Sequence, residues 1–225
     1  MNKIVKIILV LVIPVAAFVL VAMKVFHTEG TRPSSVTPHE LLIADISNKK
    51  IVDTAVSLLR SGYIVLRMGA GADSRMLAQM NQKNRSFSHC GIVMIEGGYP
   101  FVYHSIGGED NPDERLRRDS AKFFFSPKHN TAVAVVKYDF SDDEVNKLMK
   151  VVQTYYAQRP RFDMKFDLKS DDKLYCAEFV YKAVNKAVND TAYITTTTAA
   201  GYTFVGIDDL FVNPHAHIVW QTAFK

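Results

Sequence analysis

The segment that most restricts the fold is a pair of short apolar stretches joined by two glycines. In residues 88–96 (SHCGIVMIE), the side chains would alternate between two faces in the manner of a half-buried strand. Four residues of this strand share one face: His89, Gly91, Val93 and Ile95. Gly97 and Gly98 supply turn residues, and residues 100–106 (PFVYHSI) form a second strand. The segment therefore predicts a β-hairpin, and with it an antiparallel sheet.

Helical patterns follow later in the chain. Residues 141–159 carry apolar side chains on one face as far as Pro160, and Ser141 with Glu144 matches a capping box. Residues 175–188 repeat apolar residues at helical spacing. The other predicted elements are a helix at 51–62 and strands at 63–67, 131–138, 202–207 and 216–224. This set predicts an α+β fold in which a small antiparallel sheet packs against helices.

The N-terminal region differs from the rest. Residues 7–23 contain no charged residue; Lys3 and Lys6 precede them and Lys24 follows. A run of this length is near the lower limit for spanning a bilayer, so we expect an uncleaved membrane anchor, with a removed signal peptide as the alternative. The lysines favour an N-terminus on the inner side of the membrane. The rest of the chain would then be exported, to the periplasm or the outside of the cell. The expected parts are an anchor or signal segment at 1–25, a linker and lead-in at 26–49, and one domain at 50–225.

The charge pattern argues against nucleic acid as a partner. The chain has 27 Lys and Arg against 23 Asp and Glu, and three of the lysines belong to the first 24 residues. The remaining chain is therefore almost neutral and has no basic surface for phosphate. The charged run at 114–120 (ERLRRDS) is interpreted as a solvated loop.

A cysteine and two histidines are the candidate reactive groups. Cys176 stands in the first turn of the helix predicted at 175–188, where unpaired backbone N–H groups stabilise a thiolate and an oxyanion. His89 is a candidate proton partner, and His104 on the neighbouring strand is a candidate for orienting it. The residues alone leave other interpretations open, in which Cys176 is a small apolar core residue and both histidines are structural.

The other cysteine and a histidine pair have structural interpretations. Cys90 alternates to the face opposite His89 and is predicted to lie in the core, although a Cys90–Cys176 disulfide is an alternative. His215 and His217 would share one strand face as a metal pair, but without a third ligand they are interpreted as surface residues. We expect no metal and no other cofactor.

Three motifs together resemble a known family. They are FSHCGIVMIE at 87–96, FVYHS at 101–105 and KLYCAEFVYKA at 173–183. They are similar to the circularly permuted papain-like cysteine hydrolases of the NlpC superfamily, in the YiiX/YebB-like branch. Ordinary members place the cysteine helix before the histidine strand, whereas the permuted branch has the inverse order, as this chain does. The resemblance runs from about residue 61 to residue 211.

The resemblance implies a role for each matching residue. Cys176 would be the nucleophile, His89 the general base and His104 the third, orienting group, while Tyr175 would line the oxyanion site. The branch commonly has a glutamate at the third position, and it often has Gly-Asp-Ile where this chain has Gly62 followed by Tyr and Ile. Three residues near the motifs are candidates for substrate contact: Arg67, Phe87 and Tyr103.

The implied reaction is hydrolysis of an amide through a thioacyl-enzyme. Expected substrates are envelope peptides, cell-wall amides or acylated amino acids. Three alternatives remain open: acyl transfer or thioester cleavage on lipids, a non-catalytic binding module, and a structural domain stabilised by a disulfide.

Overall fold

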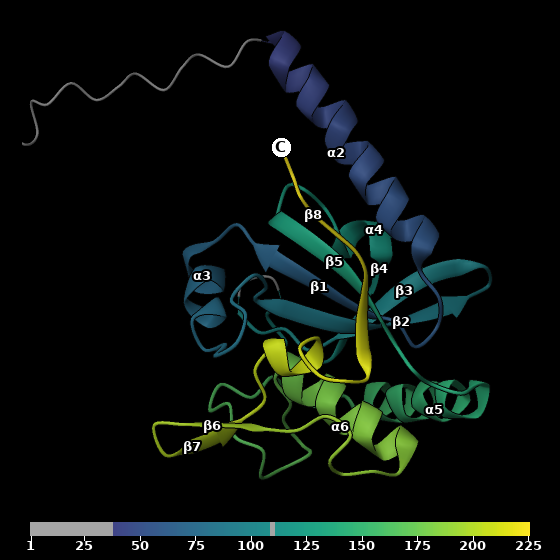
Figure 1. Ribbon diagram of the computed structural model, residues 1–225, viewed down its shortest axis with the longest axis vertical. Helices are drawn as coiled ribbons and strands as arrows, with labels where there is room; N and C mark the ends of the chain where they lie inside the picture. Colours follow the sequence, from purple (N-terminus) through teal and green to yellow (C-terminus); the bar gives the residue numbers. More distant parts are fainter. Residues whose placement is uncertain (1–37, 109–110) are drawn as a thin grey trace, which may run out of the picture. The chain divides into compact units, whose positions relative to one another are not determined.

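The computed structural model describes residues 38–108 and 111–225 (Figure 1). Within these residues the main sheet has six antiparallel strands in the order β4-β3-β2-β1-β5-β8. Its strands are β1 (Ile64–Gly69), β2 (His89–Glu96), β3 (Tyr99–His104), β4 (Arg117–Ser120), β5 (Asn130–Tyr138) and β8 (Ala216–Ala223). A separate hairpin consists of β6 (Thr197–Ala199) and β7 (Tyr202–Phe204). The helices are α2 (Pro38–Leu58), α3 (Ala72–Ala78), α4 (Ala121–Phe124), α5 (Asp142–Gln158), α6 (Cys176–Val188) and the 3₁₀ turn η1 (Asp208–Leu210). The predicted α+β class is confirmed.

The predicted hairpin is formed by β2 and β3. Val93 pairs with Val102, and the chain reverses at Gly97 and Gly98, which both have positive φ angles of 55° and 84°. Glycine adopts these angles without the steric cost that a Cβ would add. The hairpin therefore fixes the register that carries His89 and His104.

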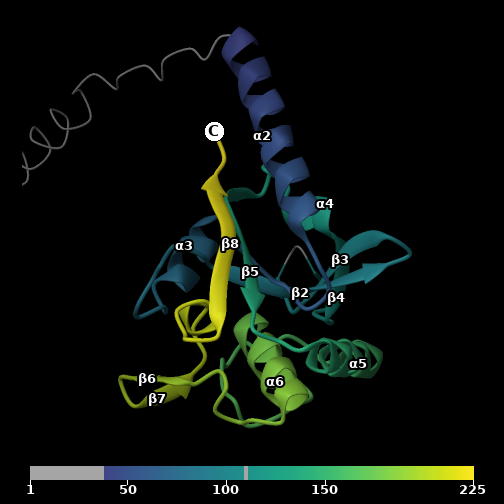
Figure 2. The same cartoon turned by 45° about the vertical axis from the view of Figure 1, so that its right-hand side comes forward.

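The sheet has a hydrophobic core on each face. One face presents Ile64, Cys90 and Ile92 to α5 and α6. The other face presents Val65 and Val102, with other valines, to α4 and to the part of α2 that follows Ile46. Figures 1 and 2 show α5 and α6 on one side of the sheet and α4 on the other. Because side chains alternate along a strand, neighbours such as His89 and Cys90 face different layers.

The two predicted helices near the site are present. Helix α5 starts at the capping box of Ser141 and Glu144, and it ends where Arg159 adopts a left-handed conformation (φ 53°) before Pro160. Helix α6 buries an almost continuous apolar face against the sheet and has Cys176 as its first residue. The apolar spacing and the helix-end residues of the sequence are therefore sufficient to predict both α5 and α6.

Three segments differ from the sequence prediction. Helix α2 begins at Pro38 and ends at Leu58, whereas a linker up to residue 49 and a helix at 51–62 were predicted. The stretch from Leu41 to Ser57 has no proline or glycine to stop a helix, and proline is favoured in a first turn. The run at 114–120 is not a solvated loop throughout, since Arg117–Ser120 pairs with β3 as strand β4. The strand predicted at 202–207 is the shorter β7, paired with β6.

The predicted membrane segment at 7–23 lies outside the described residues. Within residues 38–108 and 111–225, no helix has both the length and the apolar character needed to cross a bilayer. Residues Ile46–Lys225 form one compact unit, which begins within α2.

Candidate active site

The first turn of α6 is held by the residue before the cysteine. The backbone N–H of Tyr175 donates to Glu178 Oε2 at 3.1 Å, which satisfies a group at the helix start. The hydroxyl of the same tyrosine accepts a hydrogen bond from the backbone N–H of Val205 at 2.7 Å. Cys176 follows as the first helical residue, with 7% of its surface exposed. The thiol therefore has a fixed position at the positive end of the helix dipole.

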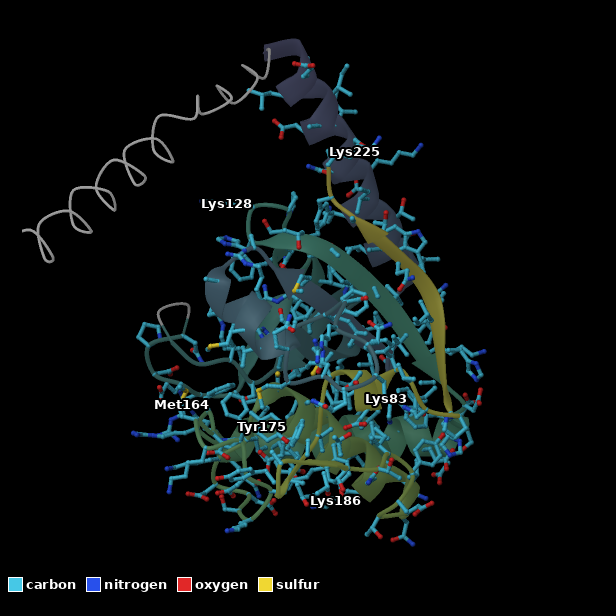
Figure 3. All side chains as sticks on the ribbon, turned by 60° about the vertical axis from the view of Figure 1, so that its left-hand side comes forward. Lys83, Lys128, Met164, Tyr175, Lys186 and Lys225 are labelled. Carbon is cyan, nitrogen blue, oxygen red and sulfur yellow. The ribbon has the colours of Figure 1, made fainter. Side chains whose placement is uncertain are left out.

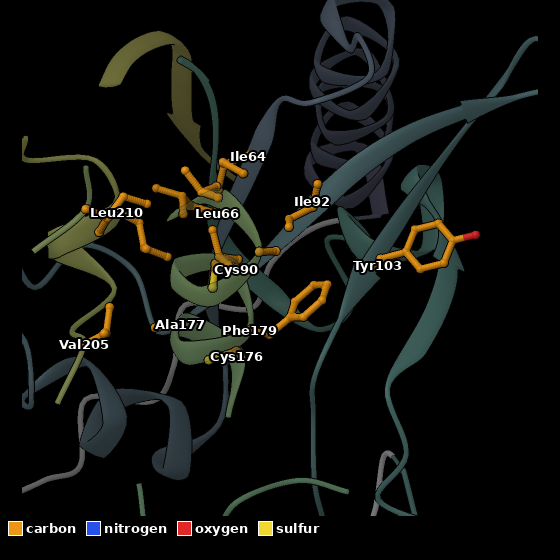
Figure 4. Packing of buried hydrophobic residues seen from close by; sticks show 14 of the residues in the cluster. Ile64, Leu66, Cys90, Ile92, Tyr103, Cys176, Ala177, Phe179, Val205 and Leu210 are labelled. Atoms are coloured by element: carbon orange, nitrogen blue, oxygen red, sulfur yellow. The ribbon is translucent and has the colours of Figure 1, made fainter. Parts of the chain in front are cut away.

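The surroundings of Cys176 favour its thiolate. A hydrogen bond from the Cys90 side chain lowers the pKa of Cys176; burial opposes this effect, and the backbone N–H of Ala177 supports it. Burial and the neighbouring Cys176 raise the pKa of Cys90 well above its ordinary value. Figure 4 shows the Cys90 side chain directed toward α6 from β2. Both cysteines are free, so the structure contains no Cys90–Cys176 disulfide.

Two histidines and an aspartate form a hydrogen-bonded chain on the other face of the hairpin. His89 Nε2 lies 2.8 Å from His104 Nδ1, and His104 Nε2 lies 3.0 Å from Asp119 Oδ2. The side chain of Arg117 donates to Asp119 Oδ1 at 2.9 Å. Both imidazoles pack against Phe124, with ring centroids 5.8 and 5.3 Å away. The sequence did not indicate a role for Asp119, because this residue belongs to the charged run at 114–120 that was interpreted as a loop.

Burial and neighbouring charges keep the imidazoles of His89 and His104 neutral. Burial, then the positive charge of Arg67, lowers the pKa of His89 well below its ordinary value. Burial also lowers the pKa of His104, although the hydrogen bond to Asp119 acts in the opposite direction. For Asp119, burial alone would raise the pKa, but hydrogen bonds from His104 and Arg117 outweigh it and lower the pKa. At neutral pH the aspartate is ionised and His89 can accept a proton.

A cavity of about 600 Å³ joins the cysteine and histidine sides of the site. Four predicted site residues line it: Cys176, His89, Tyr175 and Arg67. Much of its wall is apolar and comes from α3 and the turn after it, from the chain before α6 and from the segment after β7: Met76, Leu77, Met80, Phe162, Met164, Phe166, Val205 and Ile207. Figure 3 labels Met164 and Tyr175, which both belong to the segment leading into α6.

Cys176 and His89 both belong to the lining of the cavity. Among the described residues no hydrogen bond joins Cys176 and His89, although both side chains line the cavity. Catalytic hydrogen bonds are often long in ligand-free enzymes and shorten when substrate binds. The Nε2 atom of His89 is in a hydrogen bond with His104. The other ring nitrogen of His89, Nδ1, takes no part in this hydrogen bond.

Other candidate residues lie outside the cavity. Tyr103 is buried, donates from its hydroxyl to Glu96 at 2.8 Å and stacks edge-on against Tyr156. Figure 4 shows its ring pointing away from Cys176. Phe87 is buried and packs edge-on against Phe211, with ring centroids 5.6 Å apart. Neither side chain lines the cavity, so the structure gives no support for substrate contact by these two residues.

The histidine pair near the C-terminus is separate from this site. His215 stacks on Tyr193 with ring centroids 3.9 Å apart, and His217 Nε2 lies 2.8 Å from Asp139 Oδ2. Among residues 38–108 and 111–225, no group of three or more His, Cys, Asp or Glu side chains is placed to hold a metal ion.

The fold of this chain is also found among solved structures. The fold is similar to that of the metalloprotein YiiX from Escherichia coli O157:H7, with a TM-score of 0.59 and 18% sequence identity. The match covers 72% of this chain and 97% of the YiiX chain. No family model and no curated protein sequence matches this chain. The structural likeness shows a shared fold, while the family and the activity that the three motifs imply stay predictions.

Proposed function

We propose that this protein is a cysteine-nucleophile hydrolase that cleaves amides through a thioacyl-enzyme. The observation that carries the proposal is the cavity lined by both Cys176 and His89, with His104 hydrogen-bonded behind His89. A thiol at a helix start, a neutral imidazole and a buried orienting group are the three parts of such a site. If residues 7–23 export the domain, the substrates are amides of the cell envelope: peptides, cell-wall amides or acylated amino acids.

The reaction follows from the position of these groups. His89 takes the proton of Cys176, and the thiolate attacks the amide carbonyl carbon, whose π electrons move to the oxygen. Backbone N–H groups in the first turn of α6 stabilise this oxyanion, with Tyr175 at the edge of the same cavity. When the C–N bond breaks, the leaving amine receives the proton from His89. Water then attacks the thioester, His89 takes a proton from the water, and the released sulfur is protonated again.

The direct test compares three variants of the full chain. Cys176→Ala is expected to abolish both turnover of an amide panel and labelling by a thiol-directed activity probe. His89→Ala is expected to lower the rate about 10²- to 10⁴-fold. Cys90→Ala is the matched cysteine variant, and mass spectrometry is expected to find its label still on Cys176. Labelling that disappears with Cys90 and persists without Cys176 would contradict the proposal.

The apolar wall of the cavity favours a second candidate function. A cavity of about 600 Å³ is in the usual range for a ligand site, and methionine and phenylalanine side chains suit an aliphatic acyl chain. In this candidate function the thiolate attacks the carbonyl carbon of a lipid ester or thioester, and the alcohol or thiol leaves with the proton held by His89. The acyl group then passes from Cys176 to water or to an alcohol or amine acceptor, whose proton returns to His89 and then to the sulfur. Each added CH₂ that enters the cavity would then raise kcat/KM about fourfold. Rates independent of acyl length would favour peptide-like amides instead.

A further inference from the structure

Asp119 ends a chain of hydrogen bonds that begins at the cavity. The chain runs from His89 Nε2 to His104 Nδ1, and from His104 Nε2 to Asp119 Oδ2. Strand pairing places Asp119 of β4 opposite Val102, two residues before His104 on β3, so Asp119 and His104 are diagonal neighbours on the same face of the sheet. His104 is only 2% exposed, so water has little access to its ring. Both ring nitrogens of His104 must therefore find their partners within the protein.

The position of each proton follows from these contacts. A neutral imidazole has one N–H group and one acceptor nitrogen, whereas an ionised carboxylate only accepts. The proton of His104 must therefore be on Nε2, facing Asp119, and its Nδ1 must be an acceptor. His89 then has to donate from Nε2, which leaves its Nδ1 without a proton.

We propose that Asp119 is a positioning residue that sets the tautomer of both histidines and keeps His89 Nδ1 free to take the proton of Cys176. The proposal rests on the hydrolase function proposed above and adds a fourth member to the predicted cysteine–histidine–histidine set. Asp119 does not line the cavity, so it acts through His104 rather than on the substrate.

The neighbouring charges explain why the carboxylate of Asp119 decides which nitrogen of each imidazole holds the proton. Arg117 donates to Asp119 Oδ1, and Arg67 is the cation that lies opposite His89 on β1. In Asp119→Asn, Arg117 attracts the amide oxygen, so the amide N–H₂ is turned toward His104 Nε2. His104 then carries its proton on Nδ1 and His89 must accept at Nε2. The Nδ1 atom of His89 becomes protonated and cannot act as a base toward the thiol.

The experiment measures tautomers directly in the full chain. ¹⁵N chemical shifts of the wild-type imidazoles are expected to show both His89 and His104 protonated at Nε2. In Asp119→Asn the proton of each ring is expected to move to Nδ1, with a fall in kcat of about 10²- to 10⁴-fold. The matched control is Asp139→Asn, which removes a carboxylate from His217 on the surface and is expected to change neither quantity more than about twofold.

The outcomes separate this proposal from the hydrolase function. A wild-type His89 protonated at Nδ1, or an Asp119→Asn variant with unchanged tautomers, would overturn the positioning role even if the enzyme is active. An inactive wild-type protein with the expected tautomers would overturn the hydrolase function alone. If Asp119→Asn does not fold, the wild-type spectrum and Asp119→Glu, which keeps the carboxylate and is expected to retain both Nε2 protons, still decide the question.

Discussion

Ser105 donates a hydrogen bond from its hydroxyl to the backbone carbonyl of Leu174. The serine follows His104, and the leucine stands two residues before Cys176, so this bond connects the histidine strand with the start of the cysteine helix. Ser105 and Leu174 are 1% and 0% exposed, which means that no solvent can replace the bond. This bond thus connects two parts of the candidate site that are distant in the sequence, close to His104 and Cys176.

Replacement of Ser105 by alanine would leave the Leu174 carbonyl buried without this donor. We expect the free energy of unfolding in urea to fall by about 1–3 kcal/mol. The control is Ser57→Ala, since Ser57 donates to the Thr54 carbonyl in an exposed part of α2 and is expected to cost much less. Equal losses in the two variants would contradict the importance of the buried bond.

Cys90 is expected to tune the thiol of Cys176. Because its side chain donates to Cys176, Cys90→Ala should raise the pKa of Cys176 and slow its alkylation at pH 7. Cys90→Ser keeps an O–H donor and should retain more of the lowered pKa. The measurement is the rate of iodoacetamide labelling at Cys176 as a function of pH. A pH profile unchanged in Cys90→Ala would show that the contact between the thiols has no effect.

Arg67 is expected to keep His89 neutral together with burial. Burial is the larger cause of the lowered pKa of His89, and the charge of Arg67 is the second. Arg67→Met should therefore raise the pKa of His89, so that the imidazole becomes protonated at a higher pH. An NMR titration of His89 measures this change. Arg60→Met, which removes an exposed arginine of the segment between α2 and β1, should leave the titration unaltered; a raised pKa in this control would point to a general charge effect.

Glu178 is expected to make the protein less stable as pH rises. Burial raises its pKa to about 7, and Lys182 at 3.0 Å offsets only part of this effect. Below its unfolded pKa, which lies near 4.5, both states bind the proton and there is no penalty. Between that value and about 7 the unfolded state loses its proton first, so stability falls as pH rises and then levels off.

Glu178→Gln should flatten this part of the stability profile, because a glutamine does not ionise and still accepts from the Tyr175 N–H. Urea unfolding at several pH values between 4.5 and 8 measures the difference between variant and wild type. Glu144→Gln is the control of opposite sign, since hydrogen bonds from Ser141 lower the pKa of Glu144 and its stabilisation is lost on acidification. Parallel profiles of wild type and Glu178→Gln would contradict the prediction.

The local patterns of the sequence predicted the elements that carry Cys176, His89 and His104. Alternation and two glycines were sufficient for the hairpin, and apolar spacing was sufficient for α5 and α6. These signals are local, so they can be read without knowledge of the neighbours. The expectation of a permuted papain-like fold required the three motifs as well, because the order of strands in a sheet depends on contacts between distant segments.

Asp119 and Tyr103 could not be placed from the sequence for the same reason. The charged run around Asp119 lacks the apolar alternation of a strand, and it becomes β4 only because β3 offers an edge for pairing. Tyr103 was expected near the substrate because of its neighbours in the sequence. It lies instead on the face of β3 opposite His104, where its hydroxyl meets Glu96.

The place of β4 at the border of the sheet has a consequence for heat inactivation. Its backbone is hydrogen-bonded to one neighbouring strand only, so its opening disrupts fewer bonds than the opening of a central strand such as β1. Once β4 detaches, the carboxylate that orients the two imidazoles leaves with it, while the thiol and most of the core stay in place. We expect catalysis to fail at a lower temperature than the one at which the domain unfolds.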